Sequence, residues 1–294
     1  MRSLLFVPGD QERKLAKALS AGADTLVLDL EDSVAAEAKA AARELVRGFL
    51  SKAPRQPSAP RLFVRINSLS SPSWGDDLAA VMASAPHGIV LPKPSSGADV
   101  HRLSLAMHDA EAAVGIARGA TRIIAIATET PASLLAMASY VGASSRLEGL
   151  AWGAEDLSAA LGATASRDAS GALTSPFRLA RDLCLLTAAA AGVAALDQVF
   201  ADIRDHEGLA REAHQAARDG FAGKMAVHPG QIETINAAFT PSPEEIARAA
   251  DIVRLFAEHE GMGVVAYRGE MLDRPHVTRA QRILARARLA GLDV

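Results

Sequence analysis

Short apolar runs alternate with longer segments of helical periodicity along most of this chain. Runs rich in Val, Ile and Leu are typical of strands, whereas apolar residues three or four positions apart are typical of amphipathic helices. The strand pattern covers residues 3–7, 24–30, 61–66, 88–92, 122–128, 147–152, 196–203 and 224–229. The helical pattern between these runs covers residues 11–22, 39–52, 75–84, 98–115, 131–142, 176–192 and 209–220. The alternation predicts a series of βα units.

The predicted strands are nearly continuous in apolar residues, which is typical of a parallel sheet covered by helices. About eight such units in this length fit a (β/α)8 TIM barrel better than an open doubly wound sheet, and no GxGxxG motif follows any of the strands. We therefore predict an α/β fold in which residues 1–240 form a TIM barrel.

The pattern changes after the eighth strand. Residues 242–261 predict a helix with Ser242 as its N-cap. Residues 263–294 predict a short strand or hairpin, a loop and a final basic amphipathic helix. We expect residues 241–294 to comprise the last barrel helix followed by a short C-terminal extension.

Composition narrows the class of protein. An apolar content of 49% allows the 294 residues to bury a large core. The 31 Lys and Arg residues are mixed with 34 Asp and Glu residues, which disfavours a nucleic-acid-binding surface. The N-terminal apolar run ends at Pro8 and is too short for a signal peptide, and no later run approaches the length of a membrane span. We expect a cytoplasmic protein.

The single cysteine, Cys184, lies in a predicted apolar helix, and no second cysteine is present for a disulfide within the chain. A buried packing role is the simpler interpretation. A catalytic thiol is the alternative, which is disfavoured because no basic neighbour in the sequence would lower the thiol pKa.

In a TIM barrel, catalytic side chains lie at the C-terminal ends of the strands. Polar residues gather at these positions of the sequence: Asp29, Glu31, Asp32, Arg65, Asn67, Lys93, Glu129, Glu155, Asp156, Asp202 and His228. His228 has no His or Cys companion at ligand spacing, so an ordered structural histidine before Pro229 is at least as good an interpretation as a catalytic one.

Glu129 and Asp156 each follow an uncharged apolar strand and are expected to emerge into the mouth of the barrel. Mg²⁺ prefers a few carboxylates together with waters and ligand oxygens. The two residues therefore predict a Mg²⁺ site that a substrate with a carboxylate and an adjacent oxygen would complete. The alternative is that both carboxylates cap helices at strand–helix turns.

Arg65 is flanked by apolar residues, and an unpaired guanidinium is costly to bury. It therefore needs an anionic partner, which we predict to be a substrate carboxylate gripped by the guanidinium fork. The alternative is an ion pair with Glu31 or Asp32 on the neighbouring strand. These two carboxylates are predicted to hold metal-bound waters, Arg65 or a lysine in place.

Seven motifs run in order along nearly the whole chain: VPGDQERKLAKAL, DTLVLDLEDSV, VRIN, IVLPKP, IATETPASLL, LEGLAWGAEDLSAALG and KMAVHPGQI. Together they resemble the citrate lyase β-subunit-like (CitE-like) proteins of the HpcH/HpaI aldolase superfamily. The resemblance implies a TIM barrel of the phosphoenolpyruvate/pyruvate-binding type. It also implies a carbon–carbon lyase that acts on acyl-thioesters of 2-hydroxy acids.

The resemblance assigns roles to individual residues. Arg65 would hold the 2-oxo acid, Glu129 would contact both substrate and metal, and Asp156 would be the second ligand of Mg²⁺, for which Mn²⁺ is an alternative. Successive backbone N–H groups before a helix form an anion site. The N–H groups that would donate to the substrate carboxylate are those of Gly153, Ala154 and Glu155.

Residues 269–284 resemble the C-terminal segment of the stand-alone malyl-CoA and citramalyl-CoA lyases, in which an aspartate before a Pro-His pair reaches the barrel mouth of a neighbouring subunit. That aspartate is Asp273 here, and the resemblance implies that it is the catalytic acid–base in a homotrimer. The alternative is that Asp273 is the N-cap of the last helix, with Pro275 in the first turn.

The predicted function is Mg²⁺-dependent cleavage or formation of a 3-carboxy-3-hydroxyacyl-CoA thioester, such as citramalyl-CoA or malyl-CoA, with acetyl-CoA and a 2-oxo acid as products. The candidate cations for the CoA phosphates are Arg13, Lys14, Lys17 and Lys93. For the three on the first helix, a solvated helix face is the alternative. Alternative functions are the β subunit of a citrate lyase complex acting on a citryl-carrier-protein thioester, and a metal-dependent pyruvate aldolase. The charged residues at the strand ends disfavour a non-catalytic binding barrel.

Overall fold

Eight parallel strands close into a barrel in the computed structural model, which describes residues 1–259 and 261–294. Each strand pairs with the next along the chain, and β8 pairs with β1 to complete the ring. The strands are β1 (Ser3–Pro8), β2 (Thr25–Asp29), β3 (Arg61–Arg65), β4 (Gly88–Leu91), β5 (Arg122–Ile126), β6 (Leu147–Ala151), β7 (Ala194–Asp197) and β8 (Gly223–Ala226). The predicted TIM barrel is confirmed.

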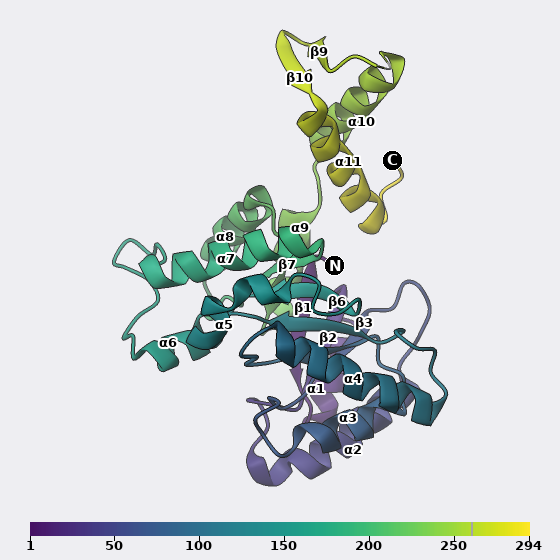
Figure 1. The fold of residues 1–294 in the computed structure, drawn as a ribbon, viewed down its shortest axis with the longest axis vertical. Coiled ribbons are helices and arrows are strands. Elements are labelled where there is room, and N and C mark those ends of the chain that lie inside the picture. The colour runs from purple at the N-terminus through teal and green to yellow at the C-terminus, as the bar shows by residue number, and fades with distance from the viewer. Residues whose placement is uncertain (260) are drawn as a thin grey trace. The chain divides into compact units, whose positions relative to one another are not determined.

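Helices connect the strands and cover the outside of the barrel (Figure 1). They are α1 (Glu12–Ala18), η1 (Ala36–Ala38), α2 (Lys39–Lys52), α3 (Trp74–Met82), α4 (Gly97–Val114), α5 (Pro131–Leu135), η2 (Met137–Tyr140), α6 (Glu155–Leu161), α7 (Ser175–Ala191), α8 (His206–Asp219), η3 (Pro229–Gln231) and α9 (Ile232–Phe239), where η marks a 3₁₀ turn. Cys184 is fully buried in α7, where burial raises the pKa of its thiol, in keeping with a packing role. Among the described residues, no helix combines the length and the apolar character needed to cross a membrane.

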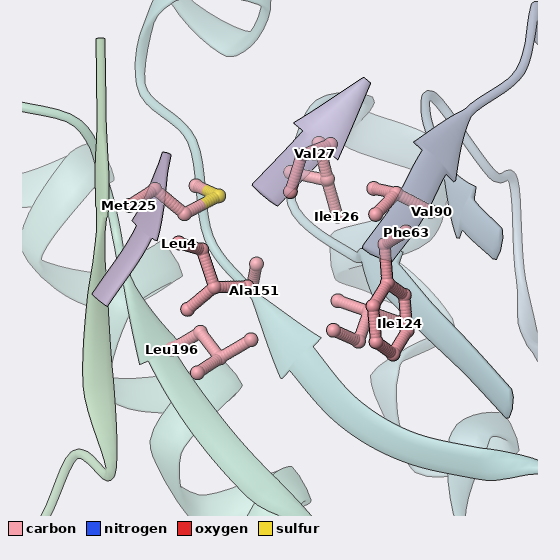
Figure 2. Close-up of a cluster of buried hydrophobic side chains, with 9 residues drawn as sticks. All are labelled: Leu4, Val27, Phe63, Val90, Ile124, Ile126, Ala151, Leu196 and Met225. Atoms are coloured by element: carbon pink, nitrogen blue, oxygen red, sulfur yellow. The ribbon is translucent and has the colours of Figure 1, made fainter. Parts of the chain in front are cut away.

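Apolar side chains from all eight strands fill the interior of the barrel, where they point toward one another (Figure 2). They are Leu4, Val27, Phe63, Val90, Ile124, Ile126, Ala151, Leu196 and Met225. Side chains alternate across a strand, so the residue two positions beyond one of these faces the interior as well, nearer the C-terminal end of the strand. Asp29 and Arg65 occupy such positions after Val27 and Phe63.

The seventh strand begins earlier and ends sooner than the sequence pattern predicted. β7 spans Ala194–Asp197, whereas the pattern placed the strand at residues 196–203. Val199 lies in the loop that follows and packs against the barrel core, which accounts for its apolar character without a strand. Asp202, expected at the strand end, is exposed in the same loop. The carboxylate that ends β7 is therefore Asp197.

Residues Ala237–Val294 form a second compact unit, after a barrel unit that spans Met1–Asn236. The second unit contains α10 (Pro243–Glu258), an antiparallel hairpin of β9 (Val264–Tyr267) and β10 (Glu270–Asp273), and α11 (Arg274–Leu289). Its apolar core consists of Ala249, Ile252, Val265, Leu272, Ala280 and Leu284. We expected α10 to be the last barrel helix, but its apolar face packs with α11 and the hairpin in this core. Glu260, part of that expected helix, lies outside the described residues.

Candidate active site

Charged side chains gather where β2 to β6 end, at the mouth of the barrel. We call this set the mouth cluster; its members are Asp29, Glu31, Asp32, Arg65, Lys93, Glu129 and Asp156. The sequence placed all of them at predicted strand ends, and the structure brings them together through hydrogen bonds, ion pairs and close charge interactions.

Arg65 is held by Asp29 on the neighbouring strand. Its Nε and Nη2 atoms lie 2.7 Å from the two carboxylate oxygens of Asp29, and its Nη1 atom lies 3.1 Å from Glu31 Oε2. The ring of Phe6 covers the guanidinium at 4.8 Å. The sequence suggested Glu31 or Asp32 as its protein partner, whereas Asp29 is the bidentate one. Hydrogen bonds to Asp29 engage the Nε and Nη2 atoms, so the remaining N–H donors of the guanidinium can bind a further anion.

Asp29 also shapes the loop that carries Glu31. Its carboxylate oxygens accept hydrogen bonds from the backbone N–H groups of Glu31, at 2.9 Å, and Ser33, at 3.1 Å. Asp29 is 1% exposed, and burial alone would raise its pKa. The hydrogen bonds that it accepts, first of all from Arg65, outweigh burial and hold the pKa below its usual value. Asp29 therefore stays ionised and fixes both the guanidinium and the β2–α2 loop.

Lys93 links the other members of the mouth cluster. Its backbone N–H donates to Glu129 Oε2 at 2.6 Å, and its ammonium donates to Glu31 and, at 2.7 Å, to Asp32 Oδ2. The same ammonium lies 3.4 Å from Asp156 Oδ1. Burial would lower the pKa of Lys93, but the surrounding carboxylates raise it above its usual value. Lys93, a candidate for the CoA phosphates, thus has its charge enclosed by carboxylates of the protein.

Glu129 is a buried carboxyl group with little compensation for its charge. It is 6% exposed, and burial raises its pKa to about 8, helped by the negative charges of Asp156 and Glu31. The N–H of Lys93 and the charge of Arg65 offset only part of this rise. A cation bound against the carboxylate would favour the ionised form.

The mouth cluster suits a hard divalent cation. Its carboxylates outnumber its basic side chains, so a dication would reduce the excess of negative charge. Glu129 and Asp156 provide hard oxygen ligands, and Mg²⁺ commonly takes its other ligands from water and substrate. In residues 1–259 and 261–294, no group of three or more His, Cys, Asp or Glu side chains is arranged to hold a metal ion. A site with two carboxylates and several non-protein ligands is the form that fits these residues.

The turn between β6 and α6 carries the N–H groups assigned to substrate binding. The N–H of Gly153 donates to Thr128 Oγ1 at 2.9 Å and is therefore engaged within the protein. No acceptor for the N–H groups of Ala154 and Glu155 is found in the described part of the chain. The first turn of α6 then carries Asp156, whose side chain is 34% exposed. Two free N–H groups thus adjoin a predicted metal ligand.

The predicted CoA cations of the first helix are solvent-exposed. Arg13, Lys14 and Lys17 lie on the outer side of α1, whose buried side is formed by Leu15 and Ala18. Because α1 follows β1, its first turn lies toward the mouth end of the barrel. The position is suitable for a phosphate contact and equally typical of a solvated helix face.

Asp273 belongs to the C-terminal unit, where it ends β10 and is the N-cap of α11. Pro275 lies in the first turn of the helix, as the capping alternative predicts. The Oδ1 atom of Asp273 lies 2.6 Å from Nδ1 of His276, and the side chain of Asp273 is 51% exposed. The carboxylate is oriented by its histidine neighbour and remains accessible to solvent.

Two parts of the site were not foreseen from the sequence. The bidentate role of Asp29 was missed, because its pairing with Arg65 depends on the register of β2 and β3. Thr128, which holds the Gly153 turn, gave no signal of its own. The sequence left a structural and a catalytic role open for His228. Its side chain is the N-cap of η3 and accepts a hydrogen bond from Gly230.

Known proteins are similar to this chain in both sequence and fold. The profile of the family described as HpcH/HpaI aldolase/citrate lyase matches residues 2–229. A citrate lyase subunit beta-like protein of Mycobacterium tuberculosis is 40% identical over 283 residues, which cover 96% of this chain and 94% of that protein. The mitochondrial citramalyl-CoA lyase of Mus musculus is 33% identical over 302 residues, which cover 97% of this chain and 86% of that protein.

A solved structure extends this similarity to the whole fold. The crystal structure of CitE from M. tuberculosis in complex with magnesium, acetoacetate and coenzyme A matches with a TM-score of 0.78 at 37% identity. The match covers 97% of both chains. This chain belongs to the HpcH/HpaI aldolase/citrate lyase family.

Proposed function

We propose that this protein is a Mg²⁺-dependent carbon–carbon lyase that cleaves or forms a 3-carboxy-3-hydroxyacyl-CoA thioester, such as citramalyl-CoA or malyl-CoA. Cleavage yields acetyl-CoA and a 2-oxo acid. The mouth cluster carries the proposal, because an anchored Arg65 with spare donors adjoins two carboxylates, Glu129 and Asp156, that suit a dication. The mouse relative is a citramalyl-CoA lyase, and the M. tuberculosis complex contains magnesium, acetoacetate and coenzyme A, which supports the same chemistry.

Different groups at the barrel mouth bind the carboxylate of the 2-oxo acid and the oxygen beside it. The spare donors of Arg65 and the N–H groups of Ala154 and Glu155 bind its carboxylate. Mg²⁺, or Mn²⁺ in its place, held by Glu129 and Asp156 supplies a Lewis acid for the oxygen beside that carboxylate. Arg65 stabilises negative charge on the same oxygen, and a preorganised donor of this kind is typically worth roughly 3–4 kcal/mol.

Proton transfer is assigned to Asp273. Breaking the carbon–carbon bond leaves a thioester enolate, whose carbon must gain a proton; in the condensation direction the same proton must be removed. The 2.6 Å contact with His276 gives the Asp273 carboxylate a partner that orients it. We propose that Asp273 serves the site of a neighbouring copy in a homotrimer, as the resemblance of its segment suggests.

The CoA moiety is proposed to bind beside α1. Arg13, Lys14 and Lys17 offer three exposed cations for its phosphates. Lys93 does not belong to this group, because its ammonium is enclosed by carboxylates. The enzyme is proposed to be cytoplasmic and to act on small molecules, without a nucleic-acid or membrane partner.

Glu129→Gln tests the metal site. Purified protein with Mg²⁺ and acetyl-CoA is offered pyruvate, glyoxylate and oxaloacetate in turn, and the acyl-CoA products are identified by mass. We expect one acid to condense only when Mg²⁺ is present. The variant keeps the size of the side chain but loses its charge, so activity should fall by about a thousandfold. Full activity in a folded variant would remove Glu129 from the metal site, and Glu207→Gln on the exposed side of α8 is the control.

Asp273→Asn separates proton transfer from binding of the 2-oxo acid. We expect exchange of the acetyl-CoA methyl protons with deuterated water to slow by roughly a hundredfold to ten-thousandfold, because general base catalysis typically accelerates proton transfer by that factor. Mg²⁺-dependent binding of the 2-oxo acid, measured by calorimetry, should be unchanged. Asp293→Asn near the C-terminus provides the matched control. Unchanged exchange in Asp273→Asn would exclude it as the base.

One alternative function shares this assay. The similarity to a citrate lyase subunit beta-like protein makes a citryl thioester on a carrier protein a competing substrate. The purified chain can be given citryl-CoA and the carrier-bound citryl thioester side by side. Turnover of the carrier-bound form alone would favour a citrate lyase β subunit, and turnover of a free CoA thioester favours the proposed lyase.

A further inference from the structure

Lys93 has an uncommon backbone conformation for a residue other than glycine. Its φ angle is +49°, in the left-handed region, and it stands between Pro92 and Pro94. This conformation is sterically unfavourable for a residue with a side chain. It persists only where contacts with the surrounding structure enforce it. Thr130 Oγ1 donates to the carbonyl of Pro94 at 3.0 Å and so ties this turn to the end of β5. The fold therefore holds Lys93 in one place.

The turn directs two groups of Lys93 toward the two proposed metal ligands. The backbone N–H donates to Glu129 Oε2 at 2.6 Å, and the ammonium lies 3.4 Å from Asp156 Oδ1. The ammonium also donates to Glu31 and Asp32, so it lies among three carboxylates. It thus places a positive charge beside the position where a dication would bind. An ammonium with these contacts is not a free amine nucleophile, which excludes covalent catalysis as its role.

We propose that Lys93 sets the metal affinity of the site: its ammonium is the counter-charge of the mouth cluster without metal, and it competes with the dication for Asp156. This inference rests on the metal site of the proposed function. Two positive charges close together repel each other, so the ammonium weakens binding of the dication. Its backbone N–H has the opposite effect, because it positions Glu129.

Lys93→Met tests the competition. Methionine has a similar length, lacks the charge and keeps the backbone N–H that donates to Glu129. We expect the dissociation constant for Mg²⁺, measured by calorimetry, to fall by roughly tenfold or more, because a repelling charge is removed. Without Mg²⁺, the melting temperature should fall below that of the wild type, because carboxylates lose their counter-charge. Saturating Mg²⁺ should restore most of the loss, so the increase in melting temperature on adding Mg²⁺ is larger in the variant.

Two further variants complete the design. Lys52→Met, at an exposed position in the last turn of α2, is the control and should change neither the Mg²⁺ affinity nor the Mg²⁺-induced increase in melting temperature. Glu129→Gln separates this inference from the proposed function. If Glu129→Gln loses Mg²⁺ binding and Lys93→Met binds Mg²⁺ as tightly as the wild type, only the proposed role of Lys93 is overturned. Unchanged Mg²⁺ binding in Glu129→Gln overturns the metal site itself.

Each remaining outcome decides the question as well. Weaker Mg²⁺ binding in Lys93→Met would mean that Lys93 only positions the ligands, and the competition would be rejected. If the variant is unfolded without metal, Mg²⁺ titration followed by circular dichroism replaces calorimetry, and Lys93→Gln is measured beside it. Recovery of the fold with Mg²⁺ supports the proposal, whereas variants that stay unfolded at saturating Mg²⁺ reject it.

Discussion

Two of the places where the barrel unit buries charged side chains are the mouth cluster and a second set around β7, β8 and α8. We call the second set the wall cluster; it comprises Arg167, Asp197, Glu212 and Lys224. Lys224 is 0% exposed, and its Nζ lies 2.7 Å from Asp197 Oδ2 and 2.6 Å from Glu212 Oε1. Arg167 pairs with the other oxygen of Glu212, and Trp152 Nε1 donates to the other oxygen of Asp197 at 2.6 Å.

The two sets differ in charge balance. In the wall cluster, every carboxylate oxygen has a donor. Arg181 also lies 3.8 Å from Asp197, and its own charge is paired with Asp219 at 2.8 Å, so acidic and basic side chains remain balanced. In the mouth cluster, carboxylates are in excess and the pKa of Glu129 is raised to about 8, chiefly by burial. A balanced buried set needs no further ligand, whereas excess charge in a buried site is a mark of function.

Strand geometry separates the two sets. Asp197 directly follows the inward-facing Leu196, so it points outward to the helices, whereas Asp29 lies two residues beyond Val27 and points inward. A cavity of about 1030 Å³ adjoins the wall cluster and is lined by Trp152 and Asp197 among others. Glu155, next to Asp156 of the mouth cluster, lines the same cavity, so charge balance rather than the cavity distinguishes the two sets.

Lys224→Met is expected to give the largest effect on stability. Removing one partner of a buried ion pair leaves uncompensated charge, so the free energy of unfolding should fall by about 3–5 kcal/mol. Urea unfolding followed by circular dichroism measures this loss. The Mg²⁺ affinity of the folded fraction should be unchanged, because the Lys224 ammonium donates to Asp197 and Glu212, which do not belong to the mouth cluster.

The comparison with Lys93→Met makes this prediction sharper. Saturating Mg²⁺ should restore the stability of Lys93→Met but not of Lys224→Met, because position 224 is fully buried and Trp152 and Arg167 still occupy one oxygen of each wall carboxylate. Rescue of Lys224→Met by Mg²⁺ to the same extent would remove the distinction between the two sets. If Lys224→Met lowers the free energy of unfolding by less than about 1 kcal/mol, the ion pairs of Lys224 contribute no more stability than a surface ion pair.

The sequence was sufficient to place Arg65, Glu129 and Asp156, because a residue that follows a buried barrel strand emerges at the mouth. It was not sufficient to find Asp29 as the bidentate partner of Arg65. These two residues stand directly opposite each other in the register of β2 and β3. An apolar run predicts that a strand exists but not its register with the next strand, so the pairing appears only when the barrel is assembled.

Lys93 marks a second limit of the sequence. Left-handed backbone is typical of Gly and Asn, and nothing in the residue types of IVLPKP predicts it at a lysine between prolines. The contacts that hold the turn come from Glu129 and Thr130, which follow the next strand. The direction of the ammonium therefore depends on tertiary structure. The sequence suggested a CoA phosphate as a partner of Lys93 and suggested that Glu31 and Asp32 hold a lysine, but it did not identify that lysine as Lys93.

A third buried ion pair, between Glu111 and Arg146, extends the comparison to acid pH. Glu111 is 1% exposed on α4, and both of its oxygens lie 2.6 Å from the Arg146 guanidinium. Burial alone would raise the pKa of Glu111. Hydrogen bonds from Arg146, Thr121 and Gly119 outweigh burial and lower the pKa from 4.5 to about 2. The pair is balanced in charge, like the wall cluster.

A lowered pKa in the folded state means that Glu111 contributes stability above pH 4.5 and loses it as the pH falls toward about 2. The lowering of the Glu111 pKa corresponds to about 3 kcal/mol of folding stability. In urea unfolding between about pH 6 and pH 2.5, Glu111→Gln should be less stable than the wild type at the upper end, and the gap should close toward the lower end. A gap that stayed constant with pH would show that the lost contribution is packing rather than charge. Mg²⁺ affinity should be the same in both proteins at about pH 7, because a balanced pair on the outer helix shares no ligand with the mouth cluster.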